Sequence, residues 1–225
     1  MTLPPPEALA ALAIVIFFAI GLHEYAHCKM ADLAGDPTPG IQGRVTLNLT
    51  KHFTMMGTIM IILTSLSGIG MGWGKPSPCD PRKMRNPRWD FFATIAAGPL
   101  CNVLQAAVYA VLLRLCLQGA PQLLDSLFVR FLLVQGVIIN LALFFFNMIP
   151  FGPLDGHWLL GVFMPDKQRY YWYRFNHQVG TIGLFAVIVG LDLVRQQGGP
   201  DVLWTVIGTP LAASYHLFTG TPFPL

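Results

Sequence analysis

The chain has 225 residues, of which 54% are hydrophobic and only 11% are charged. Because roughly a quarter of the residues of a typical soluble domain are charged, this composition excludes an ordinary water-soluble fold and predicts an α-helical integral membrane protein. The formal net charge of +3 is small and scattered along the chain, which excludes nucleic-acid binding. The four cysteines lack a C-x-x-C spacing and are expected to be buried thiols.

Apolar runs follow one another along the whole chain. They cover about 7–30, 55–73, 91–117, 127–149, 177–194 and 201–218. Runs of this length predict a multi-pass helical bundle in a lipid bilayer, and we expect a single membrane-embedded domain over residues 1–225. The last two runs are expected to be weaker spans.

Positively charged residues indicate how the runs are oriented. The loop 74–90, "GKPSPCDPRKMRNPRWD", is rich in Lys and Arg and is expected to be cytoplasmic, as is the stretch after the first run. Both ends of the run 55–73 then lie on one side of the membrane. Because that run is short and interrupted by glycines, we expect it to be re-entrant rather than to span.

A short polar stretch at residues 43–52, "GRVTLNLTKH", alternates apolar and polar residues. Period-two alternation with β-branched residues predicts a β-strand or hairpin. The edge of such a strand could bind an extended peptide, and Asn48 is then a candidate substrate-binding residue. A hairpin that only connects neighbouring elements is an equally good interpretation of the alternation.

The first apolar run ends in "HEYAH", which places His23 and His27 one helical turn apart on one face. Glu24 points about 100° around the helix, close enough to hold a water without being a ligand. Zn²⁺ lowers the pKa of bound water to about 7, and a neighbouring carboxylate can take its proton. The alternative is a set of polar residues that reach the headgroup region, but ionisable side chains in a membrane segment are usually functional.

A catalytic zinc ion needs a third protein ligand, with water in the fourth position. The remaining candidates are Asp155, His52, His157, His177, His216 and Cys28. Asp155 is favoured because it follows "NMIPFGP", where prolines and glycines must break the preceding helix. Irregular backbone at membrane depth is tolerated only inside protein or beside a water-filled cavity, where a carboxylate can reach a metal ion.

Three motifs in the same order resemble the site-two proteases, which are intramembrane zinc metalloproteases. "HEYAH" resembles the H-E-x-x-H motif of the family, "AAGPLCN" its G-P-x-x-N element, and "NMIPFGPLDG" its N-x-x-P and L-D-G element. The chain is most similar to the short bacterial-type members that lack PDZ and CBS domains. The resemblance covers most of residues 15–160.

The resemblance implies the role of each site residue. His23, His27 and Asp155 would bind one zinc ion per chain, and Glu24 would be the general base. Asn147 would stabilise the oxyanion or contact substrate, and Asn102 would help to line the site as a candidate substrate-binding residue.

The resemblance also implies a three-helix catalytic core within about 7–165, followed by C-terminal helices at about 177–218. The expected function is hydrolysis of peptide bonds in or near transmembrane segments of other membrane proteins, in a bacterial or archaeal cell membrane. Helix 127–149 is expected to run inward, which puts the active site nearer the cytoplasmic face.

Two other functions remain open at this point. A zinc-binding or zinc-transporting membrane protein could carry two histidines one turn apart, although a transporter usually has polar ligands across the bilayer and repeated halves. A catalytically silent protease relative that retains substrates is the second alternative. The presence of Glu24 favours an active enzyme over this alternative.

Overall fold

The structure is a computed structural model. It describes residues 5–66 and 74–224, and for 62–66 it describes the backbone alone. The part of the expected re-entrant run that covers 67–73 lies outside the described residues. The chain divides into two compact units, Met1–Asn140 and Leu141–Leu225, and each is described by itself. The expectation of a single domain stays a prediction.

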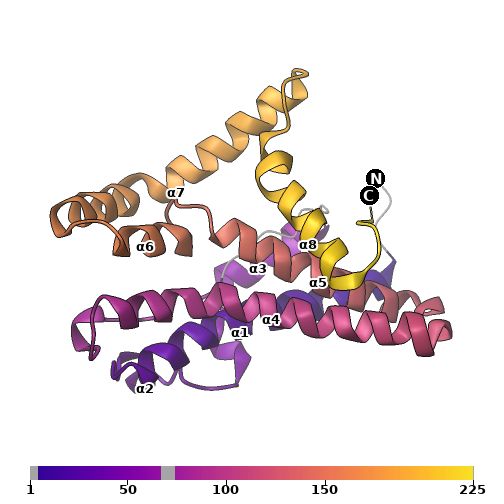
Figure 1. Cartoon of the computed structure of the whole chain (residues 1–225), viewed down its shortest axis with the longest axis horizontal. Coiled ribbons are helices and arrows are strands. Elements are labelled where there is room, and N and C mark those ends of the chain that lie inside the picture. Colours follow the sequence, from indigo (N-terminus) through magenta and orange to yellow (C-terminus); the bar gives the residue numbers. More distant parts are fainter. Residues whose placement is uncertain (1–4, 67–73, 225) are drawn as a thin grey trace. The chain divides into compact units, whose positions relative to one another are not determined.

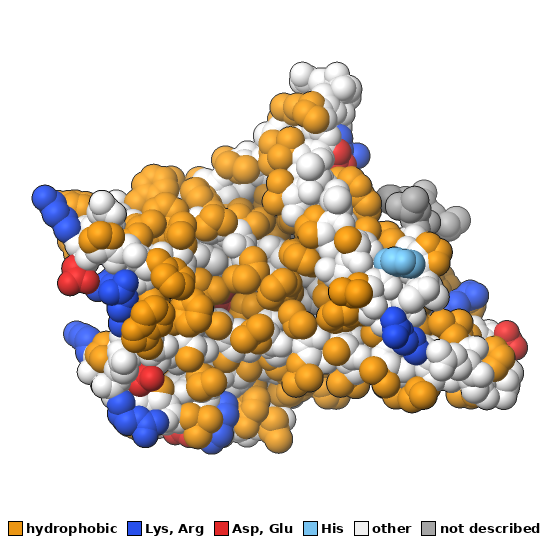
Figure 2. Space-filling view, in the orientation of Figure 1, with side chains coloured by type: hydrophobic (Ala, Val, Ile, Leu, Met, Phe, Trp, Pro, Cys, Tyr) orange, Lys and Arg blue, Asp and Glu red, His pale blue; other side chains and the backbone are white. Residues whose placement is uncertain are grey.

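Four helices of the described chain are long and apolar enough to cross a membrane, judged by length and composition. They are α1 (Pro6–Leu33), α4 (Trp89–Gly119), α5 (Leu127–Asn147) and α7 (Asp166–Gln196) (Figure 1). Hydrophobic side chains are spread over the whole face drawn in Figure 2, and Lys, Arg, Asp and Glu lie mainly toward its edges. The prediction of a helical, multi-pass membrane protein is therefore confirmed at this level.

Helices α1 and α4 form the main packing contact of the first unit (Figure 1). Small side chains at the contact, such as Ala11, Ala19, Ala106 and Ala110, are almost completely buried. Small residues let two membrane helices approach closely, and the helices run antiparallel, since residues near 19 face residue 102 and residue 27 faces residue 94.

In the described residues between α1 and α4 the elements are short. They are α2 (Thr38–Ile41), the 3₁₀-helix η1 (Leu49–His52), α3 (Met55–Leu66) and the 3₁₀-helix η2 (Pro81–Lys83). The strand predicted for 43–52 is wrong, because its first half turns and its second half is η1. Antiparallel pairing in this region is a single bridge between Phe53 and Gly74, among the residues that the structure describes.

The helix α3 has 12 residues. At 1.5 Å per residue this described part is about 18 Å long. A re-entrant path for 55–73 stays a prediction.

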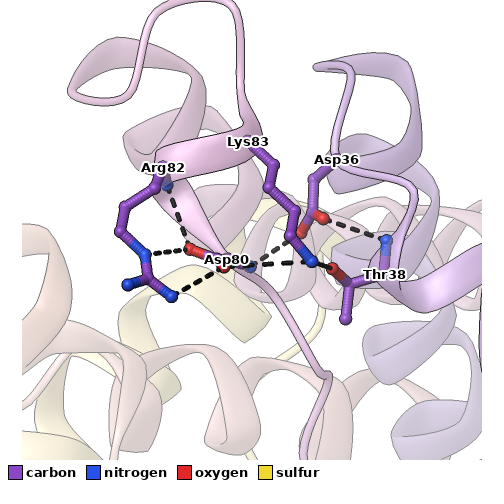
Figure 3. Close-up of polar contacts among 5 residues, drawn as sticks. All are labelled: Asp36, Thr38, Asp80, Arg82 and Lys83. Atoms are coloured by element: carbon purple, nitrogen blue, oxygen red, sulfur yellow. Dashed lines mark hydrogen bonds and ion pairs between the residues drawn. The ribbon is translucent and has the colours of Figure 1, made fainter.

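A buried carboxylate, Asp36, connects the end of α1 to the segment that leads into α4 (Figure 3). Its Oδ1 accepts a hydrogen bond from the backbone N–H of Thr38 at 2.9 Å, and its Oδ2 accepts one from that of Asp80 at 2.7 Å. The Asp80 side chain in turn accepts hydrogen bonds from Arg82, and Lys83 donates to the Thr38 hydroxyl at 2.9 Å. Residues 80–83 are thus held against the end of α1.

The second unit begins with the last turns of α5 and continues through α6 (Asp155–Val162), α7, the π-helical turn η4 (Trp204–Gly208) and α8 (Thr209–Thr219). Helix α6 packs on α7, where Trp172 donates to the carbonyl of His157 at 2.8 Å and Tyr173 donates to that of Trp158 at 3.0 Å. The peptide bond between Gly152 and Pro153 is cis. The expected span 201–218 is represented by η4 and α8, and α8 alone has 11 residues.

The cysteines are free thiols. Cys28 is buried, and Cys79, Cys101 and Cys116 are half-buried. Burial raises the pKa of the Cys79 thiol to about 11, so this group stays protonated near neutral pH.

Candidate metal centre

The imidazole rings of His23 and His27 lie against each other on α1. Both side chains are buried, and their Nε2 atoms are 3.1 Å apart. A tetrahedral zinc ion with Zn–N distances of about 2.0–2.1 Å separates two nitrogen ligands by about 3.3 Å. The observed spacing therefore suits two ligands of one ion.

Each ring is oriented by an oxygen atom of α4. The Nδ1 of His23 lies 2.7 Å from Oδ1 of Asn102, and the Nδ1 of His27 lies 2.8 Å from the backbone oxygen of Thr94. Because carbonyl oxygens can only accept, both Nδ1 atoms carry the hydrogen, which assigns a lone pair to each Nε2 in the neutral ring. Two lone pairs that face each other repel, and a shared cation removes this repulsion.

The orientation of Asn102 is itself determined by its neighbours. Its Nδ2 donates to the backbone oxygen of Ala19 at 3.1 Å and to Oδ1 of Asn140 at 2.9 Å. Since the Ala19 carbonyl is only an acceptor, the amide nitrogen must face it and the amide oxygen must face His23. Asn140 is held by a hydrogen bond from its Nδ2 to the backbone oxygen of Gly136 at 2.8 Å. Asn102 therefore orients the ring of His23, and its contact with substrate stays a prediction.

Gly98 leaves the space that the two rings occupy. A Cβ atom at this position would lie 2.2 Å from Nε2 of His27 and 2.8 Å from Cε1 of His23. These distances are far below van der Waals contact, so any larger residue would displace the rings. The face of α4 opposite the histidines must therefore carry a glycine here.

Glu24 lies half-buried beside the backbone of Gly74. A Cβ atom on Gly74 would lie 2.8 Å from Cγ and 2.9 Å from Oε1 of Glu24. Successive helical residues are about 100° apart, so Glu24 flanks the histidine face without sharing it. This placement suits a base beside a metal ion rather than a third ligand.

Asp155 is the first residue of α6, in the second unit, and is half-buried. The turn before it is tight, because a Cβ atom on Gly156 would lie 2.4 Å from the backbone oxygen of Ile149 and 2.5 Å from that of Met148. The break in the helix that the sequence predicts at 150–154 is present, since α5 ends at Asn147 and α6 begins at Asp155. The role of Asp155 as third ligand stays a prediction.

The other expected site residues have local partners. The Nδ2 of Asn147 donates to the backbone oxygen of Leu143 at 3.0 Å. Asn48 is exposed, and its Oδ1 accepts a hydrogen bond from the Thr50 hydroxyl at 2.6 Å. With no strand formed at 43–52, the strand-edge argument for Asn48 no longer applies, and its contact with substrate stays a prediction.

The alternative metal ligands either have other partners or are exposed. His157 packs on Trp158 and Tyr173, and its Nδ1 bonds to the backbone oxygen of Leu154. His177 and His216 are exposed. The Cys28 thiol lies 2.9 Å from the Ser77 hydroxyl, and His52 contacts the Thr46 carbonyl at 3.0 Å.

Several residues of the centre were not predicted from the sequence. Thr94 acts through its backbone oxygen, so no side-chain pattern identifies it. Gly98 is part of the quoted motif "AAGPLCN", but its close approach to the rings needs the structure. Asn140 does leave a signal in the sequence, because it is a polar residue inside the apolar run 127–149.

Fold and site together define a multi-pass membrane protein with a pair of histidines oriented to hold a metal ion. The chain is 30% identical over 224 residues to "Putative zinc metalloprotease YwhC" of Bacillus subtilis (strain 168), a match that covers 98% of this chain and 96% of the relative. No family model matches the chain, and no solved structure matches it. With this relative and the three motifs, the chain belongs to the site-two protease family of intramembrane metalloproteases. The relative supports a metalloprotease function.

Proposed function

We propose that the chain is an intramembrane zinc metalloendopeptidase that hydrolyses peptide bonds in or near the transmembrane segments of other membrane proteins. The observation that carries the proposal is the pair of histidines, whose Nδ1 atoms are both bonded to oxygen and whose Nε2 atoms lie 3.1 Å apart. A pair oriented in this way provides two of the three ligands that a catalytic zinc ion needs. The name of the relative points to the same metal.

His23, His27 and Asp155 would hold one zinc ion per chain. When bound, zinc lowers the pKa of a water molecule to about 7 and polarises the scissile carbonyl. A carboxylate is a suitable third ligand because it balances part of the charge of the ion beside two neutral imidazoles. Asp155 is the carboxylate that directly follows the break between α5 and α6.

Glu24 would accept the proton of the attacking water and deliver it to the leaving nitrogen. General acid–base catalysis of this kind contributes typically about 10²- to 10⁴-fold to the rate. One hydrogen of the Asn147 amide is used by Leu143, so the second could donate to the oxyanion. Removing such a donor typically costs about 2.7–4 kcal/mol of transition-state stabilisation.

The substrate class is inferred from the surroundings of the histidines. They lie on α1, one of the four helices that are long and apolar enough to cross a membrane, so a peptide must reach them from within or beside the bilayer. The basic loop 74–90 supports a location of this end of α1 on the cytoplasmic side of a bacterial or archaeal cell membrane.

The test compares Glu24→Gln with Glu7→Gln, which changes the other glutamate of the same helix at an exposed position. Purified full-length protein is assayed with labelled casein and with a single-pass membrane reporter, and its zinc content is measured. We expect one zinc ion per chain in all three proteins, and loss of cleavage by roughly 10²-fold or more in Glu24→Gln alone.

Unchanged cleavage by Glu24→Gln would overturn the mechanism. Zinc flux into sealed vesicles without proteolysis would indicate a transporter instead. Binding of the reporter without cleavage by the native chain would indicate a catalytically silent relative.

A further inference from the structure

A buried arginine lies in the segment between α2 and α3. The side chain of Arg44 is 2% exposed, and that of its neighbour His52 is 0% exposed. Burying a guanidinium group is costly unless hydrogen bonds replace most of its lost hydration. The partners of Arg44 therefore show what the buried charge holds in place.

Arg44 binds the backbone of the segment that follows Gly74. Its Nη2 donates to the carbonyl oxygen of Lys75 at 2.7 Å, and its Nη1 donates to that of Pro76 at 3.3 Å. Two N–H groups of the planar guanidinium bind successive carbonyl oxygens. They therefore determine the orientation of both peptide groups. A lysine, with a single point charge, cannot reproduce this arrangement.

His52 completes the contact from the other side. Its Nε2 lies 3.0 Å from the carbonyl oxygen of Thr46, which can only accept, so Nε2 carries the hydrogen and Nδ1 is the acceptor. The Nδ1 lies 3.5 Å from Nη2 of Arg44, and the backbone oxygen of His52 accepts a hydrogen bond from the N–H of Lys75 at 2.7 Å. Neutral His52 thus supports both the guanidinium and the backbone that it binds.

The segment held in this way runs along the Glu24 face of α1. Ile20, Glu24 and Cys28 follow one another at four-residue intervals and therefore share this face. Gly74 packs on the first two, and the Ser77 hydroxyl lies 2.9 Å from the thiol of Cys28. Arg44 binds the two residues between Gly74 and Ser77.

We propose that Arg44 is a positioning residue for the hydrolysis proposed above: with neutral His52, it holds the backbone of residues 74–76 against Glu24 and so fixes the orientation of the catalytic carboxylate. The inference rests on the proposed function. A glutamate side chain has several rotatable bonds, and a fixed backbone beside its Cγ restricts them. The guanidinium is buried, so it acts through the segment and not on substrate.

The test uses the zinc-loaded full-length chain with labelled casein and the single-pass membrane reporter. Arg44→Met removes the charge and the donors but keeps an unbranched chain, whereas Arg44→Lys keeps only the charge. The control is Arg82→Met, since the side chain of Arg82 is 89% exposed. The measured quantities are kcat, KM, zinc content and amide hydrogen exchange of Gly74, Lys75 and Ser77, since Pro76 has no amide hydrogen.

We expect Arg44→Met to lower kcat roughly 10- to 100-fold with KM changed less than about threefold, because small misplacements of a catalytic group have effects of this size. Zinc content stays at one per chain, exchange at 74–77 becomes faster, and Arg44→Lys restores little of the rate. Arg82→Met behaves like the native chain.

Full kcat in Arg44→Met, or a loss of kcat that only follows a loss of zinc or of folded protein, would overturn the positioning role. The Glu24→Gln variant in the same assay separates this failure from that of the proposed function. If Glu24→Gln is inactive and Arg44→Met is fully active, only the positioning role is wrong. If the native chain and Glu24→Gln do not differ, the proposed function is wrong and the positioning role with it.

Discussion

The two units of the chain place their proposed metal ligands in different ways. In the first unit, His23 and His27 lie on an unbroken helix, and oxygen atoms of the neighbouring helix orient their rings. In the second unit, Asp155 follows an irregular turn, and close backbone contacts at Gly156 determine its place. A broad, rigid ring is thus oriented by hydrogen bonds, whereas a short carboxylate is placed by the path of the main chain. Substitutions in the first unit should therefore misplace its ligands by moving the histidine rings, and substitutions in the second unit by moving the main chain.

The largest effect is expected at the contact between α4 and the histidines. Gly98→Ala puts a methyl group where the ring of His27 lies, so both rings must move and zinc binding should fall to background, together with cleavage. Zinc content and cleavage of the reporter by the purified protein measure the effect. Gly119→Ala in the same helix is the matched control, because a Cβ atom there meets nothing within 4 Å. Zinc binding of native strength in Gly98→Ala would contradict the geometry of the pair.

A smaller loss is expected when the turn of the second unit is altered. Gly156→Ala forces the carbonyls of Met148 and Ile149 away, which shifts the start of α6. We expect kcat/KM to fall roughly 100-fold, because this is the typical effect of misplacing one group by about 1 Å. Residual zinc should still bind the histidine pair, which distinguishes this variant from Gly98→Ala. Gly190→Ala in α7, where a Cβ atom meets nothing within 4 Å, should change neither quantity.

The hydrogen bond that orients His23 can be removed without crowding the rings. Asn102→Leu deletes the oxygen that accepts from Nδ1, and loss of such partners typically lowers metal affinity roughly 10- to 100-fold. Competition with a zinc chelator gives the affinity. Gln105→Leu, which changes another amide of α4 that bonds only weakly to Cys101, is the control. Equal zinc affinity in both variants would show that Asn102 does not hold the ring.

The smallest effect concerns pH and the segment beside Glu24. Burial lowers the pKa of His52 below 6.5; the hydrogen bond to the Thr46 carbonyl opposes this in part, and the nearby charge of Arg44 adds a smaller lowering. Arg44 and Tyr25 are the titratable side chains in contact with His52 in the described structure. As the pH falls below 6.5, His52 becomes protonated in the unfolded chain but stays neutral in the folded chain. The free energy of unfolding therefore falls by at most about 1.4 kcal/mol per pH unit.

Thermal unfolding in detergent at pH 8 and pH 5.5 measures this loss. His52→Gln keeps a donor for the Thr46 carbonyl but cannot titrate, so its unfolding temperature should fall less between the two pH values than that of the native chain. An equal fall in both proteins would show that His52 contributes nothing to the pH dependence.

The sequence predicts the parts of this molecule that depend on local pattern. The apolar runs indicate the long helices, and the spacing of His23 and His27 places both rings on one face of α1. Residues 43–52 show the limit of such reasoning, since the alternation predicts a strand whereas buried Arg44 and His52 fold the segment back on residues 74–76. Contacts between residues far apart in sequence, such as Asn102 with Asn140, leave no periodic signal.

The length of α1 has a consequence for where water meets the substrate. The helix has 28 residues, and at 1.5 Å per residue it is about 42 Å long, more than a hydrocarbon core of about 30 Å. His23 and His27 lie about 26 Å and 32 Å along its axis from Pro6. If Pro6 lies at one boundary of the hydrocarbon, the histidines lie at the other, and no aqueous channel across the bilayer is needed. A substrate helix would then be cut near its frayed end, where the last turn already has carbonyl groups without helical partners.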